Sequence, residues 1–235
     1  MSIIKNSIKP NKINNLAIFD LDNTLLAGDS DALWGQFIAQ HGHVNKEEHE
    51  RENLRFYEAY KAGTLDIYEF LEFSLKPLSE LDMAELTRLH QIFMQESILP
   101  IISQQARDLV NYHRENGDIL LIITATNRFI TAPIAKEFGI DNLLATDAEI
   151  VNNQYTGKVS GTPCFQEGKV VRLNEWLVQT GYTLENSWFY SDSHNDIPLL
   201  EKVNFPIAVD PDEKLAEHAE LKDWKILQLH PNATM

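Results

Sequence analysis

Four apolar segments of this chain are each followed at once by residues with carboxylate or hydroxyl side chains. These residues are Asp20, Thr124, Ser191 with Asp192, and Asp210. Two of the carboxylates have a second one close behind, Asp22 in the first case and Asp196 in the other. Asp and Thr often begin turns, which explains any one of these positions taken alone. Their recurrence after each apolar segment favours a shared polar site instead.

The chemistry that such a site offers is phosphoryl transfer. Gathered carboxylates repel one another and raise each other's pKa unless a cation is present. Mg²⁺ suits them, because it binds one or two carboxylates together with water and substrate phosphate. A carboxylate beside the ion can attack phosphorus to give an aspartyl-phosphate. The Thr124 hydroxyl and Lys169, at the start of an expected helix, are candidates to hold the phosphoryl oxygens. A lysine opposes the helix dipole there, which favours an anionic partner.

The elements that must position these residues alternate along the second half of the chain. Strands are expected at 119–123, 143–145, 188–190, 206–209 and 224–229, helices at 128–138, 168–179, 197–202 and 212–221, and a hairpin-like segment at 155–161. Such alternation of apolar strands with helices is typical of a parallel sheet covered by helices. The carboxyl ends of neighbouring parallel strands share one crevice, so residues far apart in the sequence can converge there.

The first expected strand, 16–19, is followed by a long helical insertion. A crossover to the next parallel strand needs about a dozen residues, but here the next strand begins roughly a hundred residues later. The interval carries apolar residues at helical spacing, and 101–115 is expected to be the returning crossover helix. We therefore expect an α/β fold: a Rossmann-like parallel sheet core formed by 1–26 and 100–235, with an inserted all-helical cap at 27–99.

Four segments resemble the motifs of a known family. Asp20-Leu21-Asp22-Asn23-Thr24 after an apolar strand resembles the first motif of the haloacid dehalogenase superfamily of phosphohydrolases. Thr124, Lys169 and the segment 191–196 resemble its second, third and fourth motifs, in the expected order. The insertion resembles the cap of the phosphoserine phosphatase-like subfamily. The segments 28–31 (Gly-Asp-Ser-Asp) and 124–127 (Thr-Ala-Thr-Asn) look more like a related subfamily that includes bacterial histidinol-phosphatases.

This resemblance implies roles for the carboxylates. Asp20 would be the nucleophile, and Asp22 would protonate the leaving oxygen and then activate water. Mg²⁺ would be bound by Asp20, Asp192 and the backbone carbonyl of Asp22. Members of the superfamily that cleave carbon–halogen bonds lack an acid at the position of Asp22, so its presence favours phosphate esters.

The same resemblance implies roles for the remaining polar residues. Thr124 and Lys169 would hold the phosphoryl oxygens. Asn195 and Asp196 would support the site, with Asp196 orienting Lys169 or the waters of the metal.

Candidates for substrate contact are Asn127, Arg128 and Asp29. Arg128 lies in the first turn of an expected helix, against the dipole, where it contacts an anion or remains a solvated surface residue. Asp29 has a simple alternative as the N-cap of the next helix.

We expect a Mg²⁺-dependent phosphomonoesterase that acts on a small phosphorylated metabolite through an aspartyl-phosphate. Acidic Asp29 and Asp31 near the cap entrance favour an amine over a second anionic group, so histidinol phosphate is the favoured substrate. The alternatives are a phosphoserine phosphatase, a phosphotransferase and a non-catalytic phosphate-binding module. The presence of both a nucleophile and an acid argues against the last.

Composition excludes other classes of function. The 235 residues include 35 acidic and 20 basic ones, and the net charge of −15 disfavours nucleic acid and membrane surfaces as partners. The leader 1–15 lacks the apolar stretch of a signal peptide, and the longest aliphatic run is too short to span a membrane. We expect a cytoplasmic protein, in which Cys164 is a core residue and the sequon at Asn232 has no role. The oligomeric state stays open.

Overall fold

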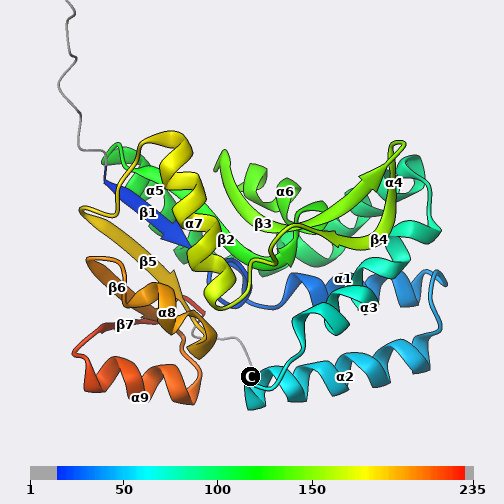
Figure 1. Ribbon diagram of the computed structural model, residues 1–235, viewed down its shortest axis with the longest axis horizontal. Coiled ribbons are helices and arrows are strands. Elements are labelled where there is room, and N and C mark those ends of the chain that lie inside the picture. The colour runs from blue at the N-terminus through cyan, green and yellow to red at the C-terminus, as the bar shows by residue number, and fades with distance from the viewer. Residues whose placement is uncertain (1–14, 231–235) are drawn as a thin grey trace, which may run out of the picture.

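In the computed structural model, which describes residues 15–230, β1 (Leu16–Phe19) lies at the centre of a seven-stranded sheet ordered β4-β3-β2-β1-β5-β6-β7 (Figure 1). The other strands are β2 (Ile119–Asn127), β3 (Asn142–Val151), β4 (Gln154–Ser160), β5 (Ser187–Ser191), β6 (Phe205–Val209) and β7 (Lys225–Leu227). All neighbours pair in parallel except β3 and β4, which form an antiparallel hairpin at one edge. The predicted α/β sheet is confirmed, and the antiparallel edge corresponds to the hairpin-like segment.

Helices lie on both faces of the sheet and beyond its carboxyl edge. They are α1 (Ser30–Gln40), α2 (Lys46–Ala62), α3 (Ile67–Glu80), α4 (Met83–Phe93), α5 (Gln104–Glu115), α6 (Arg128–Glu137), α7 (Glu167–Thr180), α8 (Ile197–Leu200) and α9 (Glu213–Leu221), with short helical turns at Met94–Ile98, Leu99–Ile101 and His194–Asp196. Side chains of Asp29, Asn45, Asp66 and Asp82 cap the first four of these helices, which fixes where each begins.

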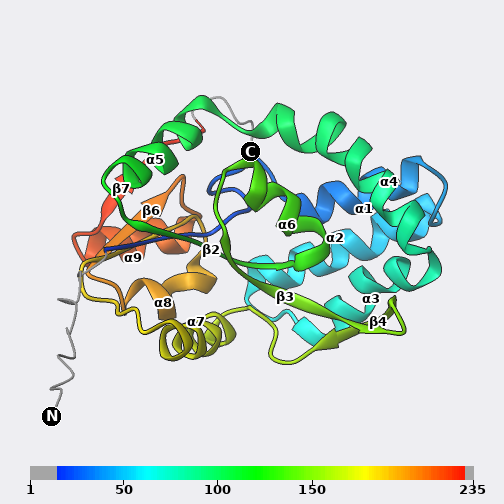
Figure 2. The same ribbon diagram turned by 90° about the horizontal axis from the view of Figure 1, so that it is seen from above.

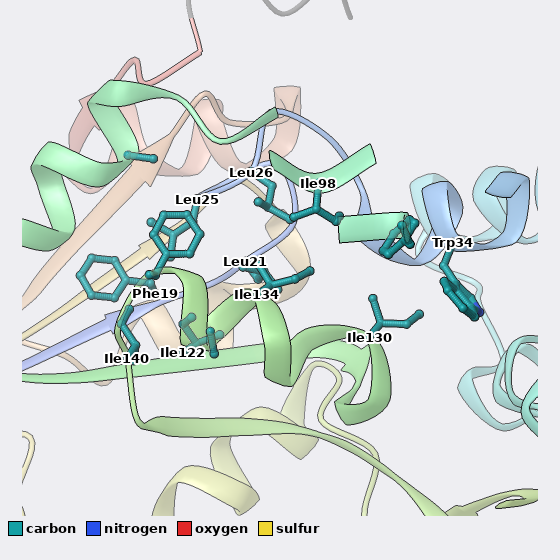
Figure 3. Packing of buried hydrophobic residues seen from close by; sticks show 14 of the residues in the cluster. Phe19, Leu21, Leu25, Leu26, Trp34, Ile98, Ile122, Ile130, Ile134 and Ile140 are labelled. Atoms are coloured by element: carbon teal, nitrogen blue, oxygen red, sulfur yellow. The ribbon is translucent and has the colours of Figure 1, made fainter. Parts of the chain in front are cut away.

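The central strand is apolar on both faces because it separates two cores. Ala17 and Phe19 pack with α5, α6 and the inserted helices (Figure 3), whereas Leu16 and Ile18 pack with α7, α8 and α9. All four residues of this strand are fully buried. Cys164 belongs to the second core, as the sequence predicted.

The inserted helices α1 to α4 lie between β1 and α5 in the chain and to one side of the sheet (Figures 1 and 2). The β3–β4 hairpin extends from the core and packs against α3. Contact is close at Gly157, where an added Cβ would lie 3.0 Å from Oγ of Ser79. We propose that the cap consists of residues 27–99. The hairpin then belongs to the core and supports the cap.

Several predicted boundaries are wrong in ways that have a physical cause. The strand expected at 143–145 continues to Val151, because from Asp147 onward it pairs with β4 in the hairpin and is no longer fully buried. The strand expected at 119–123 likewise continues to Asn127. The helix expected from 101 begins at Gln104, after helical turns that contain Pro100. The leader up to residue 14 and the sequon at Asn232 lie outside the described residues. No helix within 15–230 is long and apolar enough to cross a membrane.

Candidate active site

The carboxyl ends of β1, β2 and β5 bring the predicted motif residues to one edge of the sheet. Phe19 is in register with Ile122 on one side and with Tyr190 on the other. The backbone N–H of Asp20 donates to the carbonyl of Tyr190 at 2.9 Å. The chain therefore presents the Asp20 side chain beside the ends of both neighbouring strands.

Lys169 joins this group from the first turn of α7. Its Nζ lies 2.7 Å from Oδ1 of Asp20 and 2.7 Å from Oδ2 of Asp196, and the side chain is 5% exposed. Burial by itself lowers the pKa of Lys169, but the charges of Asp196 and Asp20 outweigh it and raise the pKa. Ser191 donates to Oδ2 of Asp196 at 2.6 Å. The lysine is thus a fixed cation beside Asp20.

Asp20 and Asp192 converge on the hydroxyl of Thr24. Its Oγ1 lies 3.5 Å from Oδ2 of Asp20 and 3.1 Å from Oδ1 of Asp192. Burial raises the pKa of Asp20 to about 7, although Lys169 lowers it, and burial and the charge of Asp20 raise the pKa of Asp192 well above its usual range. Two buried carboxylates that repel each other fit a hard divalent cation.

The donor set at this position suits Mg²⁺ in particular. Among residues 15–230, no three His, Cys, Asp or Glu side chains are placed so that together they could hold one metal ion. Two carboxylates with a backbone carbonyl and water are the ligands that Mg²⁺ commonly takes, whereas Zn²⁺ favours sets of His and Cys.

The carboxylate of Asp22 accepts hydrogen bonds from donors that the sequence analysis did not assign to it. Its Oδ1 accepts from the backbone N–H of Ser30 at 2.7 Å, and its Oδ2 accepts from Thr126 Oγ1 at 2.8 Å and from Thr124 Oγ1 at 3.4 Å. Burial, followed by the charge of Asp29, raises the pKa of Asp22 to about 6. The carboxyl can therefore give and take a proton near neutral pH. The missed donor Thr126 lies two residues after Thr124, which in extended chain places both side chains on one face.

A cavity of about 170 Å³ extends from these residues to the inserted helices. The motif residues form part of its lining. Side chains from the insertion form another part, mainly Asn53, Phe56, Tyr57, Tyr60, Ile67 and Phe70. Asp29 and Asp31 lie on the wall, and among the described residues that line this cavity Lys169 is the one cation. A larger and more open hollow beside α5 and the β5–β7 strands contains no motif residue.

The three candidates for substrate contact fall in different places. Asp29 lines the cavity and also caps α1, with Oδ1 accepting from the N–H groups of Asp31 and Ala32, so the capping role is confirmed and contact with substrate stays a prediction. Asn127 is buried and caps α6. Its Nδ2 lies 3.5 Å from Asp31 Oδ1, which places it behind the cavity wall.

Arg128 does not line the cavity, and its contact with substrate stays a prediction. Its guanidinium pairs with Asp147 and donates to the carbonyl of Leu143. Arg172 binds the other oxygen of the same carboxylate. Asp147 lies on the part of β3 that the sequence analysis did not predict, so this partner could not be foreseen.

Comparisons with known proteins agree with this geometry. Residues 17–201 match the family described as haloacid dehalogenase-like hydrolase. The chain is 46% identical over 219 residues to a protein of Neisseria meningitidis serogroup C named histidinol-phosphatase, covering 92% of this chain and 99% of that protein. A solved structure of a protein of unknown function from Bordetella pertussis Tohama I is 44% identical, with a TM-score of 0.87 over 92% of this chain and 99% of that one. A substrate-bound phosphoserine phosphatase shares the fold, with a TM-score of 0.68 at 18% identity, covering 91% of this chain and 92% of that one.

Proposed function

Because the chain belongs to the haloacid dehalogenase-like hydrolase family and is a phosphatase, we propose that it hydrolyses a small phosphate monoester through an aspartyl-phosphate on Asp20. The observation that carries this proposal is the arrangement around that buried carboxylate, which contacts Lys169 and Thr24, while the Thr24 hydroxyl also bonds Asp192. Binding alone would not require a nucleophile and a separate acid, so a non-catalytic module is the weaker candidate.

The proposed reaction has two steps. In the first, an Asp20 carboxylate oxygen forms a bond to phosphorus as the bond to the leaving oxygen breaks, and Asp22 gives that oxygen a proton. In the second, Asp22 takes a proton from water as the water attacks phosphorus, which frees inorganic phosphate and restores the Asp20 carboxylate. Lys169 and Thr124 would hold the phosphoryl oxygens. The pKa of Asp22, raised to about 6, suits both roles of this side chain.

Mg²⁺ completes the proposed site. Asp20, Asp192 and the backbone carbonyl of Asp22 would hold it. When bound, the ion neutralises negative charge on the phosphoryl group and removes the repulsion between the two buried carboxylates.

The lining of the cavity supports a cationic, ring-bearing leaving group. Asp29 and Asp31 attract an ammonium group, and Phe56, Tyr57 and Phe70 offer flat apolar surface to a ring. Histidinol phosphate has both an ammonium and an imidazole, and it has no carboxylate. The name of the Neisseria relative points to the same substrate.

Phosphoserine is the second candidate, since its phosphatases share this fold. Its carboxylate needs a cation in the cap. The three cap arginines, Arg51, Arg55 and Arg88, are exposed and pair with glutamates on the surface. Lys169, the cation in the cavity, is already bound by Asp20 and Asp196.

The test is a comparison of kcat/KM for L-histidinol phosphate and L-phosphoserine on one enzyme preparation at saturating Mg²⁺. We expect histidinol phosphate to be preferred. A tenfold preference for phosphoserine, which is about 1.4 kcal/mol of transition-state binding, would overturn the substrate and leave the phosphatase chemistry intact. A phosphotransferase would be recognised by product: adding an alcohol acceptor would convert most of the released phosphate into a new ester.

A further inference from the structure

Four hydrogen-bonded side chains connect cap helix α2 to the segment that precedes α7. Tyr60, in the last turn of α2, shares a hydrogen bond of 2.8 Å with Oγ of Ser193, which is 133 positions away. Oγ of Ser193 also accepts from the backbone N–H of Asn195 at 3.2 Å and from its Nδ2 at 3.3 Å. Oδ1 of Asn195 accepts from Nε2 of Gln166 at 2.8 Å. This series of hydrogen bonds therefore passes through the loop that follows Asp192.

Gln166 has a backbone conformation that needs such support. Its φ is 47° and its ψ is −121°, a region that residues other than glycine rarely adopt and that is held only when the surroundings enforce it. The carbonyl of Gln166 accepts from the backbone N–H of Lys169 at 3.0 Å. Any relaxation of this residue would therefore move the first turn of α7, which carries the phosphoryl-binding lysine.

The end of α2 rests on the core at two further points. The ring of Tyr60 packs against Phe165, with 6.1 Å between the ring centroids. The carbonyl of Lys61 accepts from Nζ of Lys214 in α9 at 3.1 Å. The Tyr60 hydroxyl is thus part of the surface on which this helix meets the core.

We propose that Tyr60 is a positioning residue whose hydroxyl, through Ser193, Asn195 and Gln166, aligns Lys169 when α2 rests on the core. The loop after Asp192 and the first turn of α7 then take their catalytic positions only while the cap covers the cavity. Such coupling of closure to assembly of the site keeps the reaction from starting in the presence of bulk water. This inference rests on the proposed phosphatase function.

A simpler role must be distinguished, because Tyr60 also lines the cavity. If the Tyr60 hydroxyl only touched the leaving group, the effect of removing it on turnover would differ between leaving groups, and the binding of inorganic phosphate would not change. If the hydroxyl positions Lys169, its removal should lower turnover by the same factor for every leaving group and should weaken the binding of inorganic phosphate.

The experiment uses Tyr60→Phe, which removes the hydroxyl and keeps the ring on Phe165. Turnover of two aryl phosphates with different leaving groups is measured with saturating Mg²⁺, together with inhibition by inorganic phosphate. We expect kcat to fall about three- to tenfold by the same factor for both esters, and the inhibition constant of phosphate to rise. The matched control is Tyr68→Phe in α3, because Tyr68 is exposed and lies outside the cavity; this variant should match wild type.

A double-mutant cycle with Gln166→Ala tests the connection itself. Each single substitution should lower kcat. The double variant should lower it no further than the more severe single substitution, because both substitutions interrupt the same series of hydrogen bonds. Three results would each overturn the inference and leave the proposed function in place. They are a double variant whose loss of kcat is the product of the two single losses, a loss of kcat for only one of the two esters, and an inhibition constant of phosphate that does not change. A wild-type protein that turned over neither aryl phosphate would overturn both. Urea unfolding of each variant checks that lost activity is not lost fold.

Discussion

Lys169 Nζ lies 2.7 Å from Oδ1 of Asp20, although 149 positions separate the two residues. The contact occupies one oxygen of the carboxylate with a cation and leaves Oδ2 on the side of Thr24 and Asp192. Asp196 binds the same ammonium group from the other direction. The lysine therefore balances buried charge in the free protein, and in the proposed reaction it would also offer donors to a phosphoryl group attached to Asp20.

Replacing this lysine is expected to damage stability and activity together. Lys169→Met leaves Asp20 and Asp196 buried without their shared cation, and loss of one member of a buried ion pair typically costs about 3–5 kcal/mol. Urea unfolding at pH 8 measures the loss in free energy of unfolding, and aryl phosphate turnover measures activity. Lys46→Met is the control, since Lys46 is 62% exposed in a surface pair and should change neither. A Lys169→Met protein as stable as wild type would contradict the charge-balancing role.

Substitutions of Asp20 and of Asp22 are expected to block different steps of the proposed reaction. Asp20→Asn should form no phosphoenzyme, because an amide oxygen is a far weaker nucleophile than a carboxylate. Asp22→Asn keeps the nucleophile and loses proton transfer, which typically contributes about 10²–10⁴ in rate. With an activated aryl leaving group it should therefore accumulate phosphate on Asp20. Acid-quenched intact-mass measurement detects the added phosphate, and equal labelling of the Asp20→Asn protein would rule out this nucleophile.

Magnesium is expected to support both catalysis and stability. Aryl phosphate turnover should be lost on exhaustive EDTA treatment and return with added Mg²⁺ or Mn²⁺. Mg²⁺ should also raise the Tm of the wild-type protein, because it binds the folded state alone, and should not raise that of Asp192→Asn. Full activity after metal removal would exclude the proposed mechanism.

Without metal, the stability of the folded chain is expected to fall as the pH rises. Burial raises the pKa of Asp20 in the folded protein to about 7, from the 3.8 that is usual for an aspartate. Its favourable contribution is therefore complete below the unfolded pKa and is lost as the pH rises through 7. The free energy of unfolding contributed by this group should drop by about 2 kcal/mol between pH 5.5 and pH 8. Asp20→Asn should remove that drop, whereas Asp82→Asn, at an exposed helix cap, should retain it. A pH slope unaltered by Asp20→Asn would mean that this carboxyl does not carry it.

Asp31 is expected to act on substrate choice rather than on phosphate chemistry. Burial raises the pKa of Asp31 well above its usual range, and a bound ammonium group would favour its charged form. Asp31→Asn removes this partner with little change in side-chain volume, so kcat/KM for histidinol phosphate should fall about tenfold. Turnover of an uncharged aryl phosphate should hardly change. Steady-state kinetics with both substrates give the ratio, and a parallel fall for both would indicate damage to the site instead of lost recognition of the ammonium group.

Much of the fold could be predicted because it is determined by neighbouring residues. Apolar runs such as 119–123 specify buried strands, and capping residues such as Asp29 specify where helices begin, since both effects act over a few positions. The order of the motifs and the parallel sheet then placed Asp20, Thr124, Lys169 and Asp192 at one edge. Those features need no knowledge of which side chains meet across the molecule.

Tertiary structure decided the contacts that no local pattern specifies. Arg128 had the sequence context of an anion-binding residue, and its partner Asp147 emerged only with the hairpin that continues β3. The aromatic part of the cavity lining and the hydrogen bond from Tyr60 to Ser193 depend on how α2 is placed over the core. A side chain meets its partner according to the packing of whole elements, and at separations of a hundred positions or more the sequence spacing carries no record of that geometry.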